Sequence, residues 1–427
     1  MNILWKIIVC IFNIFLPTCL SNGIITRLKK SKNIMTSTKE TRIFFYVISI
    51  PFDILLHSIF SSIKLILLWT LPLKRYGDFA FIARHFYNDV TVLKKGLWIS
   101  IKRGLLLNEL FTKGDEKYVS FGKKNKDIMF YVIRPYYFLE PNELILQNVA
   151  NLLTQYYYCL QKLSYAVEKN YIPVVDWEHY GKMPHSEDYP VNGTYNSWEY
   201  FWKQPSDYTL EEVYKSKNVI LSTQNIGQFG YIPNCAMTPP FNNYARKIAK
   251  QCPKYSNLIP FNEYTESHVN QIYDELFPKD GKILGVVIRG SSYGTKKTQY
   301  SSHPTQLPIK EVIKEVYKCL EAWEYQYIFF MNEVQELVDI MKSEFGDKLI
   351  VLPRMRDSLN RKTDGSELNP MYEDGNRFKT NLDYITEVAL LSKCDSLIGS
   401  MSSGTRTAIM WNNEKYEHMY IFERGLW

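Results

Sequence analysis

The chain has 427 residues, of which 46% are hydrophobic and 22% are charged. A charged fraction near the ordinary value of about 25% excludes a wholly disordered or wholly membrane-embedded chain, and the length predicts roughly two to three globular domains. The net charge of +7 is a mild basic bias. No Lys/Arg stripe with interleaved aromatic residues resembles a nucleic-acid module, so we expect no nucleic-acid partner.

Two apolar stretches, residues 3–20 and 43–73, lie near the N-terminus. A helix that spans a bilayer needs ~20 mainly apolar residues, so the first stretch is marginal, and the second carries Asp53, His57 and Lys64. Lys and Arg cluster between the stretches and after the second, which is typical of the cytoplasmic side of a membrane. We therefore expect residues 1–75 to associate with a membrane surface. The alternative is that residues 43–73 form an ordinary buried helical layer.

From residue 129 onward, short β-branched and aromatic runs alternate with longer helical stretches, which predicts parallel α/β structure. The first half has expected strands at 129–134 and 172–177, with a helix between them at about 142–169. The second half has expected strands at 283–288, 327–331, 348–352, 396–399 and 419–422, and helices at 309–323, 333–344, 382–392 and from 402. Ligands bind outside the carboxyl ends of strands in such sheets, so the loops after the first four of these strands should converge on one crevice.

The segment LGVVIRGSSYG, residues 284–294, places an arginine at the carboxyl end of a strand, followed by Gly290, Ser291 and Ser292. A guanidinium stays charged and offers paired planar donors that match two phosphate oxygens, so Arg289 suits a diphosphate group. The alternative is an ordinary surface ion pair.

The segment CDSLIGSMSSGTRTAIM, residues 394–410, runs from a strand through a serine-rich turn into a helix. Free N–H groups at a helix start, together with the hydroxyls of Ser402, Ser403 and Thr405 around Gly404, predict an anion-binding turn. Simple N-capping by serine is the alternative.

A third strand end, in YIFFMNEVQEL at residues 327–337, carries Asn332 and Glu333. These side chains could contact the base or ribose of a ligand, or they could cap the following helix. The chain contains no Walker loop and no GxGxxG, HExxH or Asp-x-Asp motif. We therefore expect no metal and no other cofactor.

The order of these motifs, with His303-Pro304 after the first and KYEHMYIFERGLW at the end, resembles bacterial O-fucosyltransferase-like proteins and the α-1,6-fucosyltransferase superfamily. FYVIRP, NYIPVVDW, NGTYNSWEYFWKQP and SKNVILS extend the resemblance over roughly residues 125–427. It implies a GT-B fold of two Rossmann-like domains with doubly wound parallel sheets. The acceptor-side domain would comprise residues 76–240 and the nucleotide-sugar domain residues 241–427, preceded by a helical membrane-associating extension.

The resemblance implies metal-independent, inverting transfer of a sugar from GDP-fucose to a glycan hydroxyl, in surface-polysaccharide synthesis at the cytoplasmic face of the bacterial inner membrane. The donor site would comprise Arg289, Gly290, Ser291, Ser292, His303, Asn332, Glu333, Ser402, Ser403, Gly404 and Thr405. On the acceptor side the candidates are Asp176, Trp198 and Glu199, and the two carboxylates are candidate bases by position alone.

The sequence departs from the family pattern in two places. Ser291-Ser292 stands where Thr-Asp is common, and Asn332-Glu333-Val334 stands where an acidic run is common. Two donor-binding carboxylates are therefore missing. This leaves open a noncatalytic carbohydrate-binding or scaffold protein, or a transferase for a different nucleotide sugar.

Overall fold

The computed structural model describes residues 116–136, 138–139, 146–147, 151–180, 183, 185–223, 230–235, 237, 239–289, 304–359 and 377–425. Contacts group Glu116–Phe138 and Gln147–Trp427 into one compact unit. The two apolar stretches near the N-terminus lie outside the described residues, so their association with a membrane stays a prediction. None of the helices in the described ranges is both long and apolar enough to span a membrane.

The first sheet contains strands of the first half in the order β1-β6-β2-β5. Its strands are β1 (Lys117–Val119), β2 (Phe130–Ile133), β5 (Ile172–Val175) and β6 (Val219–Leu221). Strand β2 pairs in parallel with β5 and β6, whereas β1 pairs antiparallel with β6. The prediction that the first sheet is wholly parallel is therefore wrong at the edge strand β1. With two of its three residues exposed, β1 lacks the continuous apolar run that marks a buried parallel strand.

The first sheet packs against a helix on each of its two faces. Alternate residues of a strand point to opposite sides, so the residues of β2 divide between the two helices. Tyr131 and Ile133 of β2 pack into the core that α5 (Leu152–Glu168) forms. Phe130 and Val132 pack with Val213 of the short helix α6 (Leu210–Val213). A two-stranded sheet of β3 (Phe138–Leu139) and β4 (Leu146–Gln147) lies between β2 and α5 in the sequence.

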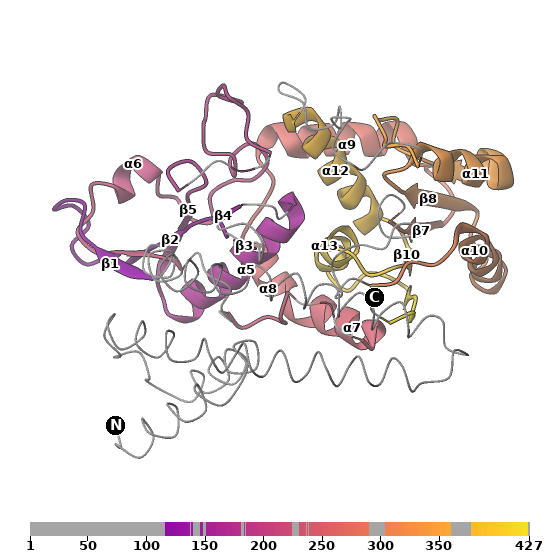
Figure 1. Cartoon of the computed structure of the whole chain (residues 1–427), viewed down its shortest axis with the longest axis horizontal. Helices are drawn as coiled ribbons and strands as arrows, with labels where there is room; N and C mark the ends of the chain where they lie inside the picture. Colours follow the sequence, from indigo (N-terminus) through magenta and orange to yellow (C-terminus); the bar gives the residue numbers. More distant parts are fainter. Residues whose placement is uncertain are drawn as a thin grey trace, which may run out of the picture. The chain divides into compact units, whose positions relative to one another are not determined.

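The second sheet is parallel throughout and has the order β11-β10-β7-β8-β9. Its strands are β7 (Ile283–Val287), β8 (Tyr327–Met331), β9 (Leu349–Ile350), β10 (Ser396–Gly399) and β11 (His418–Ile421). Two helices, α10 (Ile309–Trp323) and α11 (Gln335–Phe345), cover one face, and α12 (Arg377–Ser392) and α13 (Ser403–Asn412) cover the other (Figure 1). Short η1 (Gly346–Lys348) precedes β9. This half is the doubly wound α/β structure that the sequence predicts.

Three helices connect the two sheets along the chain: α7 (Phe241–Gln251), α8 (Pro253–Ser256) and α9 (Glu263–Leu276). A single buried cluster extends from Tyr131 in the first sheet to Ile421 in the second. Trp411 of α13 donates from its indole Nε1 to the hydroxyl of Tyr156 on α5 at 3.0 Å. The expected domain boundary at residue 240 falls between the two sheets, although the buried core crosses it. That boundary stays a prediction.

His185 gives this core a testable pH dependence. The ring is buried against Trp177 and Phe201, and burial lowers its pKa from 6.5 to about 3. The unfolded chain takes up a proton near pH 6.5 and the folded chain does not, so the stability present above pH 6.5 is lost as the pH falls toward 3. Relative to His185→Phe, we expect wild type to lose about 1.6 kcal/mol of unfolding free energy between pH 6.5 and 5, with a slope that approaches about 1.4 kcal/mol per pH unit at the lower pH. Urea unfolding at each pH measures this, and a pH-independent difference would contradict it.

Candidate functional site

The strand order of the second sheet reverses between β7 and β10. The chain adds β8 and β9 on one side of β7 and then returns to place β10 and β11 on the other. In an open parallel sheet, such a reversal opens a crevice at the carboxyl ends of the two strands, where ligands bind. The loops that begin at Ile288 and Ser400 leave the sheet on either side of this point.

Gly399 allows β10 to end close against β7. It pairs in register with Val287, and a Cβ atom at position 399 would lie 2.1 Å from the Val287 carbonyl oxygen. That oxygen accepts a hydrogen bond from the N–H of Ser400 at 2.9 Å. Only glycine fits this close backbone approach, so the geometry at the mouth of the crevice depends on it.

Arg289 follows β7 and lies beside the end of β8. Its backbone N–H donates to Oε1 of Gln306 at 2.9 Å, and its Nε lies 3.4 Å from Oε1 of Glu333. Its side chain is 34% exposed, so the guanidinium is accessible to a ligand. The structure therefore brings together Arg289 and Glu333, two of the residues predicted for the donor site.

Asn332 lies at the same strand ends but is buried. Its Nδ2 donates to the carbonyl of Ile288 at 2.7 Å, and its Oδ1 accepts from the N–H of Val334 at 2.8 Å. The amide therefore joins the loop after β7 to the loop after β8. The expected N-cap role of Asn332 is wrong, because the N-cap of α11 is Val334, with no side-chain cap hydrogen bond. A contact of Asn332 with a base or ribose stays a prediction.

Two arginines that the sequence analysis did not single out contact the turn at Asn332, which follows β8. The guanidinium groups of Arg354 and Arg356 share the carboxylate of Glu387 on α12, at 2.7 and 3.2 Å. All three side chains are at most 4% exposed, and both arginines also donate to the carbonyl of Asn332 at 3.3 Å. The signal in the sequence was LPRMRD directly after the strand. Glu387, which pairs with both arginines, lies 31 or more residues later in the sequence, so only the fold identifies it as their partner.

The serine-rich turn after β10 begins α13. Oγ of Ser402 accepts from the N–H of Thr405 at 3.1 Å, and the Thr405 hydroxyl donates to the carbonyl of Ser400 at 2.7 Å. The hydroxyl of Ser403 lies 2.8 Å from that of Thr154 on α5. These hydroxyls therefore bond within the protein, and Ser402 is an N-cap. The backbone N–H groups of Ser403 and Gly404 belong to the first turn, where an α-helix provides no acceptor, so they are the groups that could bind an anion.

The predicted acceptor-side residues differ in environment. Trp198 is fully buried between Trp177 and Trp202, with ring centroids 5.2 and 4.7 Å away, so its ring belongs to the core and cannot face a ligand. The carboxylate of Glu199 accepts hydrogen bonds from Gln204 and Thr194 at 2.6 and 3.0 Å.

Asp176 is the third acceptor-side candidate and follows β5 directly. It is buried, and its carboxylate accepts from the N–H groups of Glu178 and His179 and from the Tyr214 hydroxyl. Because its side chain is fully buried and bonded to these protein donors, Asp176 does not itself face a substrate.

Gly290, Ser291, Ser292 and His303 lie outside the described residues, so their places in the donor site stay predictions. Within the ranges that the structure describes, no group of three His, Cys, Asp or Glu side chains could hold a metal ion.

No protein-family profile and no curated protein matches the sequence. The solved structures similar to it include the fucosyltransferase NodZ from Bradyrhizobium, at 13% identity and a TM-score of 0.39, covering 70% of this chain and 98% of that one. A mutant of Arabidopsis thaliana FUT1 in complex with GDP has 11% identity and a TM-score of 0.35, with 78% and 80% covered. The apo form of POFUT1 has 8% identity and a TM-score of 0.28, with 68% and 74% covered. Similarity this weak assigns no activity to this chain.

Proposed function

We propose that the chain is a glycosyltransferase of the GT-B type. It would transfer a sugar from a nucleoside diphosphate sugar, with GDP-fucose as the expected donor, to a hydroxyl of a glycan. One observation carries this proposal: Arg289 and the start of α13 flank the reversal between β7 and β10, where an open parallel sheet binds its ligand. The choice of GDP-fucose rests on the sequence resemblance.

The chemistry would be direct displacement at the anomeric carbon. The acceptor hydroxyl attacks that carbon and releases its proton to solvent, the bond to the diphosphate oxygen breaks, and the electron pair of this bond leaves with the nucleoside diphosphate. Arg289 would pair with two phosphate oxygens, and the N–H groups of Ser403 and Gly404 would face the same charge. Groups fixed in place before the reaction stabilise developing charge most effectively.

Residues 1–75 would hold this enzyme at the cytoplasmic face of the bacterial inner membrane. Supporting this part of the proposal are the apolar stretches and the basic clusters that flank them.

A donor assay with EDTA present tests the proposal. We expect purified protein to release GDP slowly from GDP-fucose, because a guanidinium and a helix N-terminus can neutralise a diphosphate without a divalent ion. GDP release that stops in EDTA and returns with manganese would refute metal independence. If the protein turns over another nucleotide sugar and does not turn over GDP-fucose, the assignment of GDP-fucose as the donor is wrong.

A further inference from the structure

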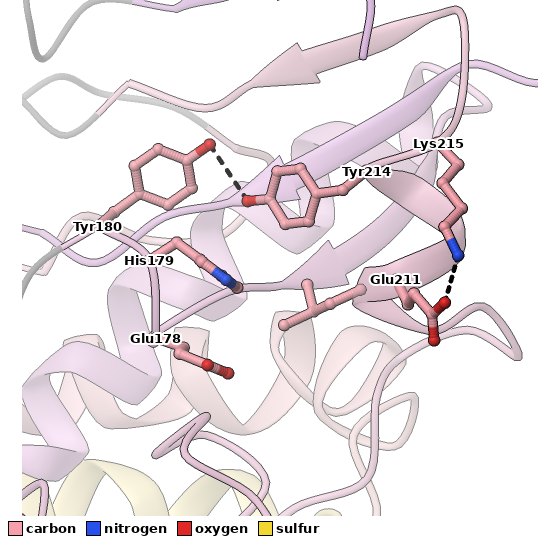
Figure 2. A pocket seen from close by; sticks show the side chains of 7 residues that line it. Glu178, His179, Tyr180, Glu211, Tyr214 and Lys215 are labelled. Atoms are coloured by element: carbon pink, nitrogen blue, oxygen red, sulfur yellow. Dashed lines mark hydrogen bonds and ion pairs between the residues drawn. The ribbon is translucent and has the colours of Figure 1, made fainter. Parts of the chain in front are cut away.

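An open groove lies on the first sheet, and its lining residues include none of the donor residues described above. Two neighbouring pockets of about 650 and 590 Å³ share Glu178, Leu210 and Glu211, and we refer to them together as the β5 groove. Figure 2 shows Glu178, His179 and Tyr180, which follow β5, opposite the segment that carries Glu211 and Tyr214. The groove therefore lies between the loop after β5 and helix α6.

A buried carboxylate orients the histidine in this groove. Nδ1 of His179 lies 3.1 Å from Oδ2 of Asp176, whose side chain is fully buried, whereas the His179 side chain is 51% exposed. A carboxylate beside Nδ1 favours the tautomer that carries its proton on that nitrogen, and in this tautomer Nε2 is an acceptor. None of the described residues donates to Nε2. The arrangement thus presents an oriented hydrogen-bond acceptor to a ligand hydroxyl.

Tyrosine rings form an aromatic wall of the groove. The hydroxyls of Tyr214 and Tyr180 are 3.2 Å apart, and the Tyr214 ring lies 5.2 Å from the ring of His179. The guanidinium of Arg134 lies 5.2 Å from the Tyr180 ring centroid, and Phe121 packs edge-on against Tyr214 at 4.7 Å. Fixed aromatic surface combined with a few oriented polar groups is typical of small-molecule sites.

The charge of the groove restricts what it can hold. Four carboxylates line it, those of Glu178, Glu199, Asp207 and Glu211. The lining cation Lys215 forms an ion pair with Glu211. A negative surface repels anionic ligands and accepts hydrogen bonds from hydroxyl or amine groups.

We propose that the β5 groove binds the acceptor saccharide, that this saccharide is neutral or carries an amine, and that Nε2 of His179 accepts a hydrogen bond from one of its hydroxyls. The inference rests on the proposed function, because it identifies the acceptor of the same transfer. It also replaces Asp176 as a direct acceptor-side contact, since Asp176 acts by positioning His179.

Saturation-transfer NMR on the full chain, with glucose, glucosamine and glucuronate as probes, tests the proposal. These sugars share a ring and differ in charge. We expect glucose and glucosamine to bind and glucuronate to bind at least several-fold more weakly. His179→Ala should weaken glucose binding roughly threefold to tenfold at an unchanged melting temperature, as expected for one lost hydrogen bond. Glu178→Gln, at an exposed position, should reduce the difference in affinity between glucosamine and glucuronate, because it removes one of the four carboxylates that line the groove.

His418→Ala is the matched control, because this exposed histidine lies on β11 in the other sheet. The proposal is overturned if His179→Ala binds glucose like wild type, if glucuronate binds as well as glucosamine, or if no sugar binds. Binding of a lysine-rich peptide without any sugar would also overturn it. Titration of GDP into the same samples separates the two claims. If GDP binds and no sugar binds, the acceptor assignment of the β5 groove is wrong and the donor proposal stands. If a sugar binds and GDP does not, the proposed donor is wrong and the groove assignment stands.

Discussion

Arg289→Lys is expected to lower the rate of GDP release at least about a hundredfold while leaving the melting temperature unchanged. Lysine keeps the positive charge near Glu333 but loses the paired, planar donors that hold two phosphate oxygens at once. A contact made mainly as the diphosphate departs is worth ~3 kcal/mol or more, by comparison with the removal of one oxyanion donor. Initial rates of GDP release, with calorimetric melting of the same samples, measure this.

Ser402→Ala is the matched comparison for Arg289→Lys. It removes an N-cap, which should cost about 0.5–2 kcal/mol of stability, but it leaves the backbone N–H groups of Ser403 and Gly404 in place. Its rate should therefore fall much less. If Arg289→Lys releases GDP at nearly the wild-type rate, the donor diphosphate does not bind at this strand end.

Glu387→Gln should lower the free energy of unfolding by about 3–5 kcal/mol, more than either Arg289→Lys or Ser402→Ala. The glutamine is similar in size but neutral, so it would leave the buried guanidinium groups of Arg354 and Arg356 without their shared counter-charge. The turn at Asn332, to which both arginines donate, should loosen in the same variant. Guanidinium chloride unfolding at pH 7 measures the change in free energy.

Glu321→Gln provides the control, since this glutamate is exposed on α10. Its free energy of unfolding should stay within about 0.5 kcal/mol of wild type. A loss below 1 kcal/mol in Glu387→Gln would mean that the buried ion pairs do not hold the loops after β8 and β9 together.

Elements with a strong local pattern could be predicted from the sequence. The helix at 309–323 and the strands at 327–331 and 396–399 have their predicted bounds, because apolar periodicity and length specify them locally. The helix expected from residue 333 begins at Gln335 instead. Residues 332–334 form a turn that pairs with Asp357, a contact that no local pattern encodes.

The candidate site divides in the same way. The position of Arg289 at a strand end could be predicted, because the carboxyl ends of parallel strands meet at one edge. The sharing of Glu387 by two arginines could not, since it depends on how α12 packs. The positioning of His179 by Asp176 also depends on the fold, because the hydroxyl of Tyr214, 38 residues later, bonds to the same carboxylate. Trp198 was expected on the acceptor side only because its segment resembles that of the family, and the structure places its ring in the core.

The most direct test of the central claim is calorimetric titration of GDP into wild-type protein and into Arg289→Lys, both with EDTA present. The proposed donor site predicts one GDP bound per chain in wild type, and binding at least about tenfold weaker in the variant, since the paired phosphate contact is lost. Equal binding of GDP to both proteins, or no binding to wild type, would contradict a diphosphate site at the crevice between β7 and β10.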